Sequence, residues 1–200
     1  MIKELVDDFI LGNNTIITAP TGHGSTVLAL HMANIILNKD KKVIYYNPTG
    51  DIDGEFIKPN YPVVYSDIFF HKESLSLFIN FLDYVNYDID NIVLDPGDSL
   101  MSNKNIFPLL SNLLKSHAGM LVTSQIRQDP TKGGQVYSPI EELNKQYNIF
   151  KYSIWIRNVT EDEQLFKARY VDVFLNHRIG NKFLRRYIIR FDSKTGVLIE

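Results

Sequence analysis

Residues 19–26 have the sequence Ala-Pro-Thr-Gly-His-Gly-Ser-Thr, and they stand between two segments of different character. The β-branched run at 15–19 predicts a strand that leads into them, and the apolar residues of 27–37 predict a mostly buried helix that follows. A strand, a turn with two glycines and a helix are the context of a phosphate-binding P-loop, whose pattern is G-x-x-x-x-G-K-[ST]. Gly24 matches the second glycine of that pattern, and Thr26 matches its final hydroxyl residue.

The same loop departs from the pattern at two positions. Ala19 stands where the first glycine belongs, and Ser25 stands where the lysine belongs. Backbone N–H groups at a helix N-terminus still bind an anion without any side chain, but serine cannot supply the cation that spans the β- and γ-phosphates. The missing charge-assisted contact costs roughly 1.5 to 3 kcal/mol of binding, and its loss affects the transition state more because charge develops there. A plain glycine-rich turn is the alternative interpretation, and the loop alone does not decide between the two.

A second motif favours the nucleotide interpretation. The apolar run at 91–94 predicts a buried strand that ends in Asp95, as in a Walker B strand, where the carboxylate reaches Mg²⁺ or the water around it. Many buried strands end in aspartate, so this pattern is weak when it stands alone. The two motifs together predict ATP with Mg²⁺ held by Thr26 and Asp95, and no cofactor if the loop is only a turn. The predicted nucleotide-binding residues are Thr21, Gly22, His23, Gly24, Ser25, Thr26 and Asp95.

Strand and helix patterns alternate through the first part of the chain. Further strands are predicted at 42–46 and 119–123, and helices at 75–84 and 106–114. Because strands separated by helices need crossover connections, these patterns predict an α/β fold with a largely parallel central sheet flanked by helices. The last third has few helical signals, and its strand-like runs predict antiparallel strands at the C-terminal end of that sheet. These runs are 152–157, 169–175 and 183–191.

The composition limits the class of protein. At 200 residues and 44% hydrophobic, the chain is long enough for one buried core, so a single domain over 1–200 is predicted. The absence of cysteine excludes disulfides, thiolate metal sites and a cysteine nucleophile. Charges within residues 1–9 argue against a signal peptide, and no apolar run approaches the roughly 18 residues of a membrane span. A cytoplasmic protein without a membrane partner is therefore expected.

The charge is distributed unevenly along the chain. The first 150 residues hold 11 basic and 17 acidic side chains, whereas the last 50 hold 10 basic and 6 acidic ones. An electropositive C-terminal quarter suits phosphate backbones, and an ordinary solvated surface gives the same pattern. Strand geometry places Arg186 and Arg190 on one face, near Lys182, with Arg185 on the other. Phosphate binding and a polar outer face are equally compatible with this arrangement.

Taken in order, these segments resemble the core domain of the RecA/RadA/UvsX recombinase family over nearly the whole chain. The unit at 15–37 is similar to that family's P-loop and helix, and Asn-Ile-Val-Leu-Asp-Pro-Gly-Asp-Ser-Leu at 91–100 is similar to its Walker B strand. Leu-Val-Thr-Ser-Gln-Ile-Arg at 121–127 resembles its strand with an N-Q-I-R-like end. The resemblance implies a RecA-like P-loop core that binds ATP and Mg²⁺, contacts single-stranded DNA, and assembles with its own copies or with a recombinase partner.

The resemblance also implies roles for individual residues. Gln125 matches the glutamine that senses the γ-phosphate, and residues 127–142 match the second DNA-binding loop. Arg178 and Asn176 match two basic positions that reach the nucleotide of a neighbouring subunit, although Asn176 carries no charge. Arg178 is therefore the candidate trans-acting cation. Together with the basic residues of the last strand, the predicted DNA-binding residues are Arg127, Lys132, Gly133, Gly134, Lys182, Arg186 and Arg190.

Three other features have a plain structural interpretation beside the functional one. His23 either contacts a phosphate or faces solvent, and solvent is favoured for a histidine in a turn. Trp155 fits a core position better than a base-stacking platform. An N-terminal helix within residues 1–12, with apolar residues at 2, 5, 6 and 9, docks on its own domain or on a neighbouring subunit, and self-docking is preferred.

The family's catalytic glutamate has no evident counterpart. Thr49 stands near the expected place after the second predicted strand. Threonine is a poor general base, and such a base typically contributes about 10² to 10⁴ in rate. Asp51, Asp53 or Glu55 takes that place only after a small shift of register. No catalytic residue is therefore assigned, and Gln125 is kept as a sensor.

Three functions are compatible with these residues. The first is a RecA-like paralogue with a degenerate nucleotide site, which supports DNA recombination, repair or replication by binding DNA or a recombinase partner, without efficient ATP hydrolysis. The second is an active DNA-dependent ATPase with an atypical P-loop, which borrows a cation such as Arg178 from the next subunit. The third is a structural or regulatory scaffold that does not bind DNA. The abundance of Asn, Lys, Ile and Tyr is typical of a low-GC phage or bacterium.

Overall fold

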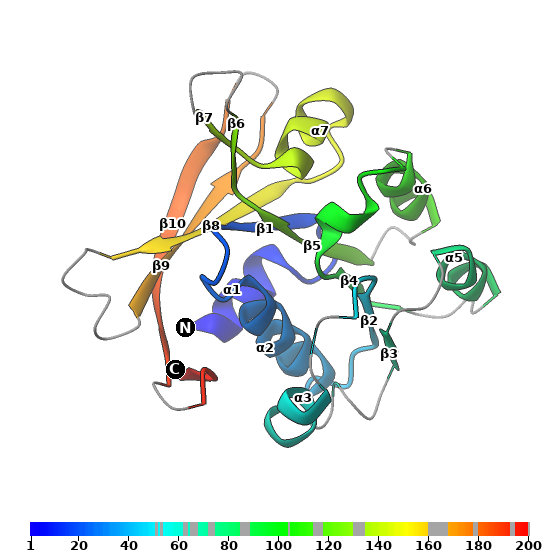
Figure 1. The fold of residues 1–200 in the computed structure, drawn as a ribbon, viewed down its shortest axis with the longest axis horizontal. Coiled ribbons are helices and arrows are strands. Elements are labelled where there is room, and N and C mark those ends of the chain that lie inside the picture. Colours follow the sequence, from blue (N-terminus) through cyan, green and yellow to red (C-terminus); the bar gives the residue numbers. More distant parts are fainter. Residues whose placement is uncertain are drawn as a thin grey trace.

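The computed structural model describes most of the chain as one arrangement of strands and helices (Figure 1). The described residues are 1–50, 52, 54–61, 64, 68–71, 75–84, 89–103, 105–113, 118–129, 135–159, 168–177, 180–192 and 195–199. The strands are β1 (Thr15–Ala19), β2 (Val43–Asn47), β3 (Ile68–His71), β4 (Asn91–Leu94), β5 (Gly119–Gln125), β6 (Arg127–Asp129), β7 (Gln135–Tyr137), β8 (Tyr152–Asn158), β9 (Ala168–Leu175), β10 (Lys182–Phe191) and β11 (Leu198–Ile199). The helices are α1 (Ile2–Phe9), α2 (Ser25–Leu37), α3 (Gly54–Asn60), α5 (Leu75–Tyr84), the 3-10 helix η1 (Gly97–Leu100), α6 (Ile106–Leu113) and α7 (Pro139–Tyr147).

The described strands form one large sheet, in the order β11-β10-β9-β8-β1-β5-β4-β2-β3, and a small sheet of β6 and β7. In the large sheet, β1 pairs in parallel with β5 and with β8, and β4, β2 and β3 continue the parallel pairing beyond β5. Helix α2 connects β1 to β2, and α6 connects β4 to β5, as crossovers between parallel strands require. The predicted α/β fold with a largely parallel sheet is confirmed.

The C-terminal strands run antiparallel to one another. β9 pairs antiparallel with β8 and with β10, and β10 pairs antiparallel with β11. The three strands predicted for this part of the chain correspond to β8, β9 and β10, so the antiparallel extension is confirmed. The short strands β3 and β11 are additions to the prediction.

The segment 127–142 contains more regular structure than the expected loop. β6 and β7 form a hairpin in it, and α7 begins at Pro139. The Ser138 hydroxyl accepts the backbone N–H of Glu141 at 3.3 Å and so caps the helix, while Pro139 occupies the first turn, where its missing N–H is not needed. Residues 139–142 are therefore helical.

Helices cover both faces of the sheet (Figure 1). Because successive side chains of a strand point to opposite faces, Ile17 of β1 joins a core with α1, α2 and α3, whereas Ile16 joins a second core with α5, α6 and α7. Both isoleucines are fully buried. The helix that follows the loop 19–26 is thus fixed in the first core, and eight of its residues are buried there.

The N-terminal helix α1 packs on its own chain. Its buried apolar residues are Ile2, Leu5 and Val6. Charged contacts flank this packing, because Asp7 pairs with Lys39 after α2, and Arg185 of β10 lies 3.7 Å from Asp8. The apolar face of the predicted N-terminal helix is thus buried against α2 and the sheet. None of the described helices has the length and apolar character that crossing a membrane requires.

Replacing Leu5 with alanine tests this packing. The substitution leaves a cavity in the first core, so we expect Leu5→Ala to lower the free energy of unfolding by about 2 to 5 kcal/mol in urea unfolding. Lys3→Ala on the exposed side of the same helix is the matched control and should change it by less than about 0.5 kcal/mol. Equal stability of the two variants, or an unfolding midpoint that depends on protein concentration, would show that α1 docks elsewhere.

Candidate nucleotide site

The loop 19–26 leads from the carboxyl end of β1 into the N-terminus of α2. Gly22 and Gly24 have φ angles of 77° and 86°, in the left-handed region that favours glycine. Gly24 is the N-cap of α2, and Ser25 is the first residue of that 13-residue helix. The positive end of the helix dipole therefore lies at the loop, as in sites that bind phosphate.

Gly24 is also constrained by a contact with the last long strand. A Cβ atom at this position would lie 2.5 Å from Cζ of Phe191, so no larger residue fits without moving that ring. Phe191 ends β10 and is buried in the core that holds α2. The C-terminal strand thereby supports the loop, a contact that the sequence pattern did not indicate.

Asp95, directly after β4, lies beneath the loop and is almost completely buried. The Thr26 hydroxyl donates to its Oδ1 at 3.2 Å, the Thr123 hydroxyl donates to the same oxygen, and the Tyr45 hydroxyl donates to its Oδ2 at 2.6 Å. Asn47 Nδ2 donates to the Asp95 backbone carbonyl at 2.6 Å. The structure thus brings together the predicted pair Thr26 and Asp95, and it adds partners from the neighbouring strands β2 and β5.

The pair Thr26 and Asp95 fits Mg²⁺ when a phosphate accompanies the ion. Hydroxyl and carboxylate oxygens are ligands that Mg²⁺ prefers, and it usually binds through one or two carboxylates plus substrate phosphates. Within the described residues, no group of three or more His, Cys, Asp or Glu side chains is placed to hold a metal without a nucleotide. The metal would therefore be held through Thr26, Asp95 and the bound phosphates together.

Gln125, the predicted sensor, lies beside the loop at the end of β5. The Thr21 hydroxyl donates to Gln125 Oε1 at 3.4 Å, and His23 Nδ1 is 3.2 Å from the Thr21 carbonyl oxygen. The register of β1 on β5 pairs Ala19 with Gln125, which explains why the two segments meet. Of the predicted residues, Thr21, His23 and Gln125 thus form one side of the candidate site.

Asp98 is a second buried carboxylate at this edge. Its side chain is 5% exposed and lies 3.9 Å from the Arg127 guanidinium. It accepts the Ser124 hydroxyl at 2.8 Å and the Gln125 backbone N–H at 2.7 Å. Burial raises the pKa of Asp98, although these two hydrogen bonds favour its ionised form. Asp98 therefore positions the start of the predicted DNA-binding segment, a role missed from sequence because it follows no strand directly.

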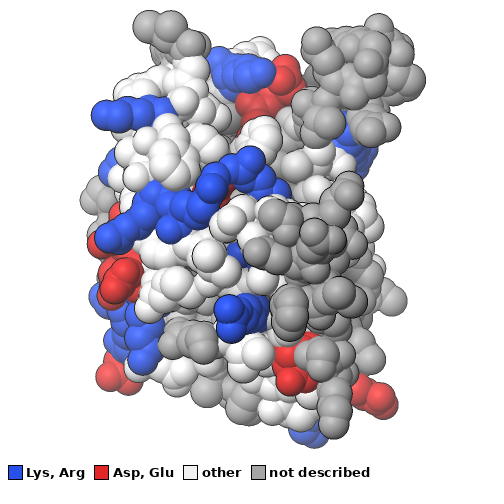
Figure 2. Space-filling model, turned by 90° about the vertical axis from the view of Figure 1, so that its left-hand side faces the viewer, with Lys and Arg blue, Asp and Glu red and all other residues white. Residues whose placement is uncertain are grey.

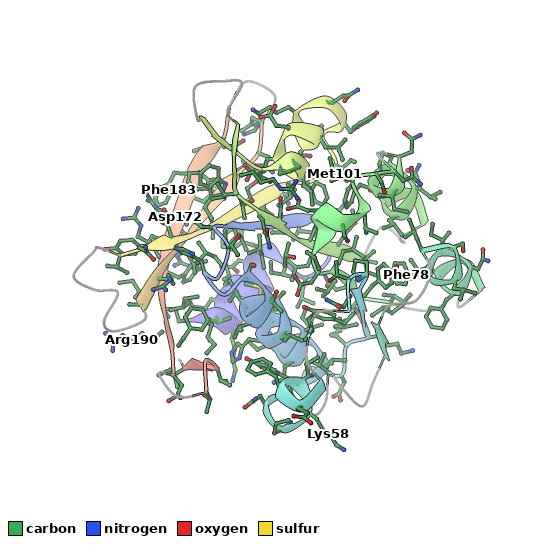
Figure 3. All side chains as sticks on the ribbon, viewed as in Figure 1. Lys58, Phe78, Met101, Asp172, Phe183 and Arg190 are labelled. Atoms are coloured by element: carbon green, nitrogen blue, oxygen red, sulfur yellow. The ribbon has the colours of Figure 1, made fainter. Side chains whose placement is uncertain are left out.

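The other predicted basic residues are spread over different elements. On β10, Arg186 donates through Nε to Oδ1 of the buried Asp172 at 2.6 Å, whereas Arg185 faces α1. The predicted alternation of these two side chains is confirmed. Lys182 and Arg190 are exposed on the same strand, and Arg190 points away from the sheet (Figure 3). The predicted basic residues of β10 therefore do not form one cluster beside the loop 19–26.

Asn176, the uncharged counterpart of a predicted basic position, has a structural role. Its Oδ1 accepts the Ser153 hydroxyl at 2.9 Å, and its Nδ2 donates to the Phe150 carbonyl at 3.1 Å. These bonds fix the end of β9. Predicted residues that lie outside the described part of the chain are Asp51, Asp53, Lys132, Gly133, Gly134 and Arg178.

Glu141 of α7 lies behind β1, on the side of the sheet opposite α2. Its Oε1 accepts the Thr18 hydroxyl at 3.1 Å and the Trp155 indole N–H at 2.6 Å. Burial raises the pKa of Glu141, although both hydrogen bonds favour the carboxylate. Trp155 thus occupies a partly buried position beside Phe174, with ring centroids 6.0 Å apart.

Comparisons with known proteins agree with this geometry at the level of the fold. No model of a known protein family matches the chain, and none of the curated proteins matches its sequence. The crystal structure of the RadB recombinase is similar, with a TM-score of 0.63, over 96% of this chain and 93% of that chain. The fold is RecA-like. The two sequences are 14% identical, so the likeness concerns the RecA-like arrangement of strands and helices.

The single tryptophan reports the ionisation of Glu141. Because burial raises the pKa of Glu141, we expect tryptophan fluorescence to titrate with a midpoint above 4.5, the ordinary value for this carboxyl group. Glu141→Gln should abolish the transition, and Glu142→Gln on the exposed side should keep it. The folded state holds the Glu141 proton more tightly than the unfolded state, so this group's contribution to stability falls as pH rises from 4.5 through the folded pKa. A midpoint at or below 4.5 would contradict the burial of this carboxyl group.

Proposed function

We propose that this chain is a RecA-like protein that supports DNA recombination, repair or replication by binding DNA or a recombinase partner, without efficient ATP hydrolysis. One observation carries the proposal. The loop keeps its two left-handed glycines and the contact between Thr26 and Asp95, while Ser25 occupies the position of the lysine. A loop that has this shape and lacks the lysine favours a protein that keeps the fold for binding over one that hydrolyses ATP efficiently.

The electrostatics of the loop support weak nucleotide binding. Residues 19–26 contain no lysine or arginine, so the N-terminus of α2 alone offers positive potential from this segment. A helix N-terminus contributes about 0.3 to 1 kcal/mol toward a surface anion, whereas a charge-assisted hydrogen bond contributes roughly 1.5 to 3 kcal/mol. The lysine is therefore the larger of the two contributions. Its loss accounts for a site that keeps its shape and binds triphosphate poorly.

Restoring the lysine tests this argument. We expect Ser25→Lys to strengthen equilibrium binding of a fluorescent ATP analogue with Mg²⁺ by about tenfold or more, since 1.4 kcal/mol corresponds to a factor of ten. Ser25→Met adds a side chain of similar length without charge, so it should not strengthen binding. If the natural chain already binds the analogue as tightly as Ser25→Lys, the second function, an active ATPase with an atypical loop, replaces this one.

The DNA-binding part of the proposal depends on the end of β5. Arg127 stands at the start of the hairpin β6–β7 and is held near Asp98, with 54% of its side chain exposed. The following segment contains Lys132. Two basic side chains in a segment that begins beside the candidate nucleotide site suit contact with a phosphate backbone.

Single-stranded DNA binding is measured by fluorescence anisotropy of a labelled oligo(dT) at increasing salt. We expect Arg127→Ala and Lys132→Ala each to weaken binding, and each to reduce the slope of log K against log salt by about 0.7, the value for one phosphate contact on a single strand. Lys41→Ala, before β2, is the control and should leave the slope unchanged. No binding by the natural chain at low salt would instead favour the scaffold function without DNA.

A further inference from the structure

Strand β10 lies near one edge of the sheet and is only partly covered. It spans Lys182–Phe191, and β11 pairs with it only at Arg190 and Phe191. On its other side, β9 pairs with it along almost its whole length. Within the described part of the chain, residues 182–189 therefore have a strand neighbour on one side only. In an antiparallel ladder alternate residues direct their N–H and C=O groups to opposite sides, so half of these residues present unpaired backbone groups.

The exposed edge carries apolar side chains. Among the described residues eight large apolar side chains are exposed, and three of them lie on this part of β10. They are Phe183 at 50%, Leu184 at 37% and Ile188 at 45%. Phe183 rests edge-on against Phe174 of β9, with ring centroids 5.7 Å apart, so it is held in place on the outer face of the sheet (Figure 3). Unpaired backbone and fixed apolar side chains together are the features of a strand that accepts another strand.

The same edge is strongly basic. It carries Lys182, Arg185, Arg186 and Arg190, and Lys and Arg side chains form a diagonal band on this side of the molecule (Figure 2). Arg186 pairs with Asp172, and Arg185 lies near acidic residues of α1. Lys182 and Arg190 are exposed, and neither has an ion-pair partner among the residues that the structure describes. Within the described ranges, their charge is not neutralised by an acidic side chain.

Charge determines which kind of strand this edge accepts. The register of β10 on β9 shifts between Phe183 and Arg185, as at a β-bulge. Bulges and basic residues prevent nonspecific pairing of sheet edges. Pairing with the β10 edge of a second copy would bring Lys182 and Arg190 of the two copies together without acidic partners on that edge. A nucleic acid satisfies the charges and can stack a base on Phe183, but it lacks the regularly spaced donors and acceptors that would complete the ladder along residues 182–189. An acidic, extended polypeptide satisfies all three.

We propose that residues 182–189 of β10 bind an extended acidic segment of a partner protein, which pairs with β10 as an additional strand. Its alternate apolar side chains cover Phe183 and Ile188 on one face, its carboxylates meet Lys182 on the other face, and a carboxylate at its end meets Arg190. This surface is separate from the loop 19–26. The proposal rests on the partner-binding part of the proposed function, and its test requires neither nucleotide nor DNA, so the two can fail separately.

The experiment uses the full chain and a labelled peptide of alternating glutamate and valine. We expect saturable binding by anisotropy, together with slower hydrogen exchange of the outward amides of residues 182–189. A peptide of the same sequence with alternate backbone nitrogens methylated should not bind, because it cannot complete the ladder. Ile188→Glu should weaken binding about tenfold or more by removing apolar contact and repelling the peptide. Leu77→Glu, an exposed leucine on α5 with 57% exposure, is the matched control and should bind normally.

Four outcomes would overturn the proposal, and three of them use the natural chain alone. The first is binding of the methylated peptide as tight as that of the unmethylated one. The second is protection of the same amides by an oligo(dT) strand and not by the peptide, which would assign the edge to nucleic acid. The third is protection of the outward amides without any peptide, in a monomer or in a concentration-dependent dimer, which would show that the edge is already covered. Equal weakening by Ile188→Glu and Leu77→Glu would also place the binding elsewhere.

Discussion

The buried carboxylate of Asp95 is the interaction on which the site depends. A carboxylate so far from water requires hydrogen-bond donors, because an isolated buried charge costs several kcal/mol. Here the donors come from Thr26 of α2, Tyr45 of β2 and Thr123 of β5. One side chain after β4 thereby fixes the helix of the loop and both adjacent strands. The contact between Thr26 and Asp95 ties the end of the loop 19–26 to the sheet.

The contacts that give the loop its shape are different from the side chain that would bind a triphosphate. Shape comes from Gly22 and Gly24, from Phe191 packed on Gly24, and from the bond between Thr26 and Asp95. The positive charge that binds a triphosphate comes from the lysine of the P-loop pattern. Here Ser25, the first residue of α2, stands at that position. None of these contacts uses the side chain of residue 25, so the fold does not need a lysine there, whereas we infer that efficient ATP hydrolysis does. The function proposed for this chain therefore rests on binding rather than on ATP hydrolysis.

The sequence predicted the elements around β1 well and the contacts between distant elements poorly. Periodicity and β-branched runs located β1, α2, β4 and the antiparallel strands, because those signals are local. Tyr45 and Thr123 were missed because their meeting with Asp95 depends on strand order, which one sequence does not reveal. Phe191 was missed for the same reason, since it contacts Gly24 from the other end of the chain. The start of α7 was predictable in retrospect, because Ser138 followed by Pro139 is a helix-start signal.

We infer that the loop 19–26 keeps the form of a P-loop and does not support efficient ATP hydrolysis. The most direct test of this inference is phosphate release from ATP by the purified chain, with Mg²⁺, in the presence and absence of single-stranded DNA. We expect release no faster than in buffer under both conditions. Magnesium-dependent release that disappears in both Thr26→Ala and Asp95→Asn would contradict it.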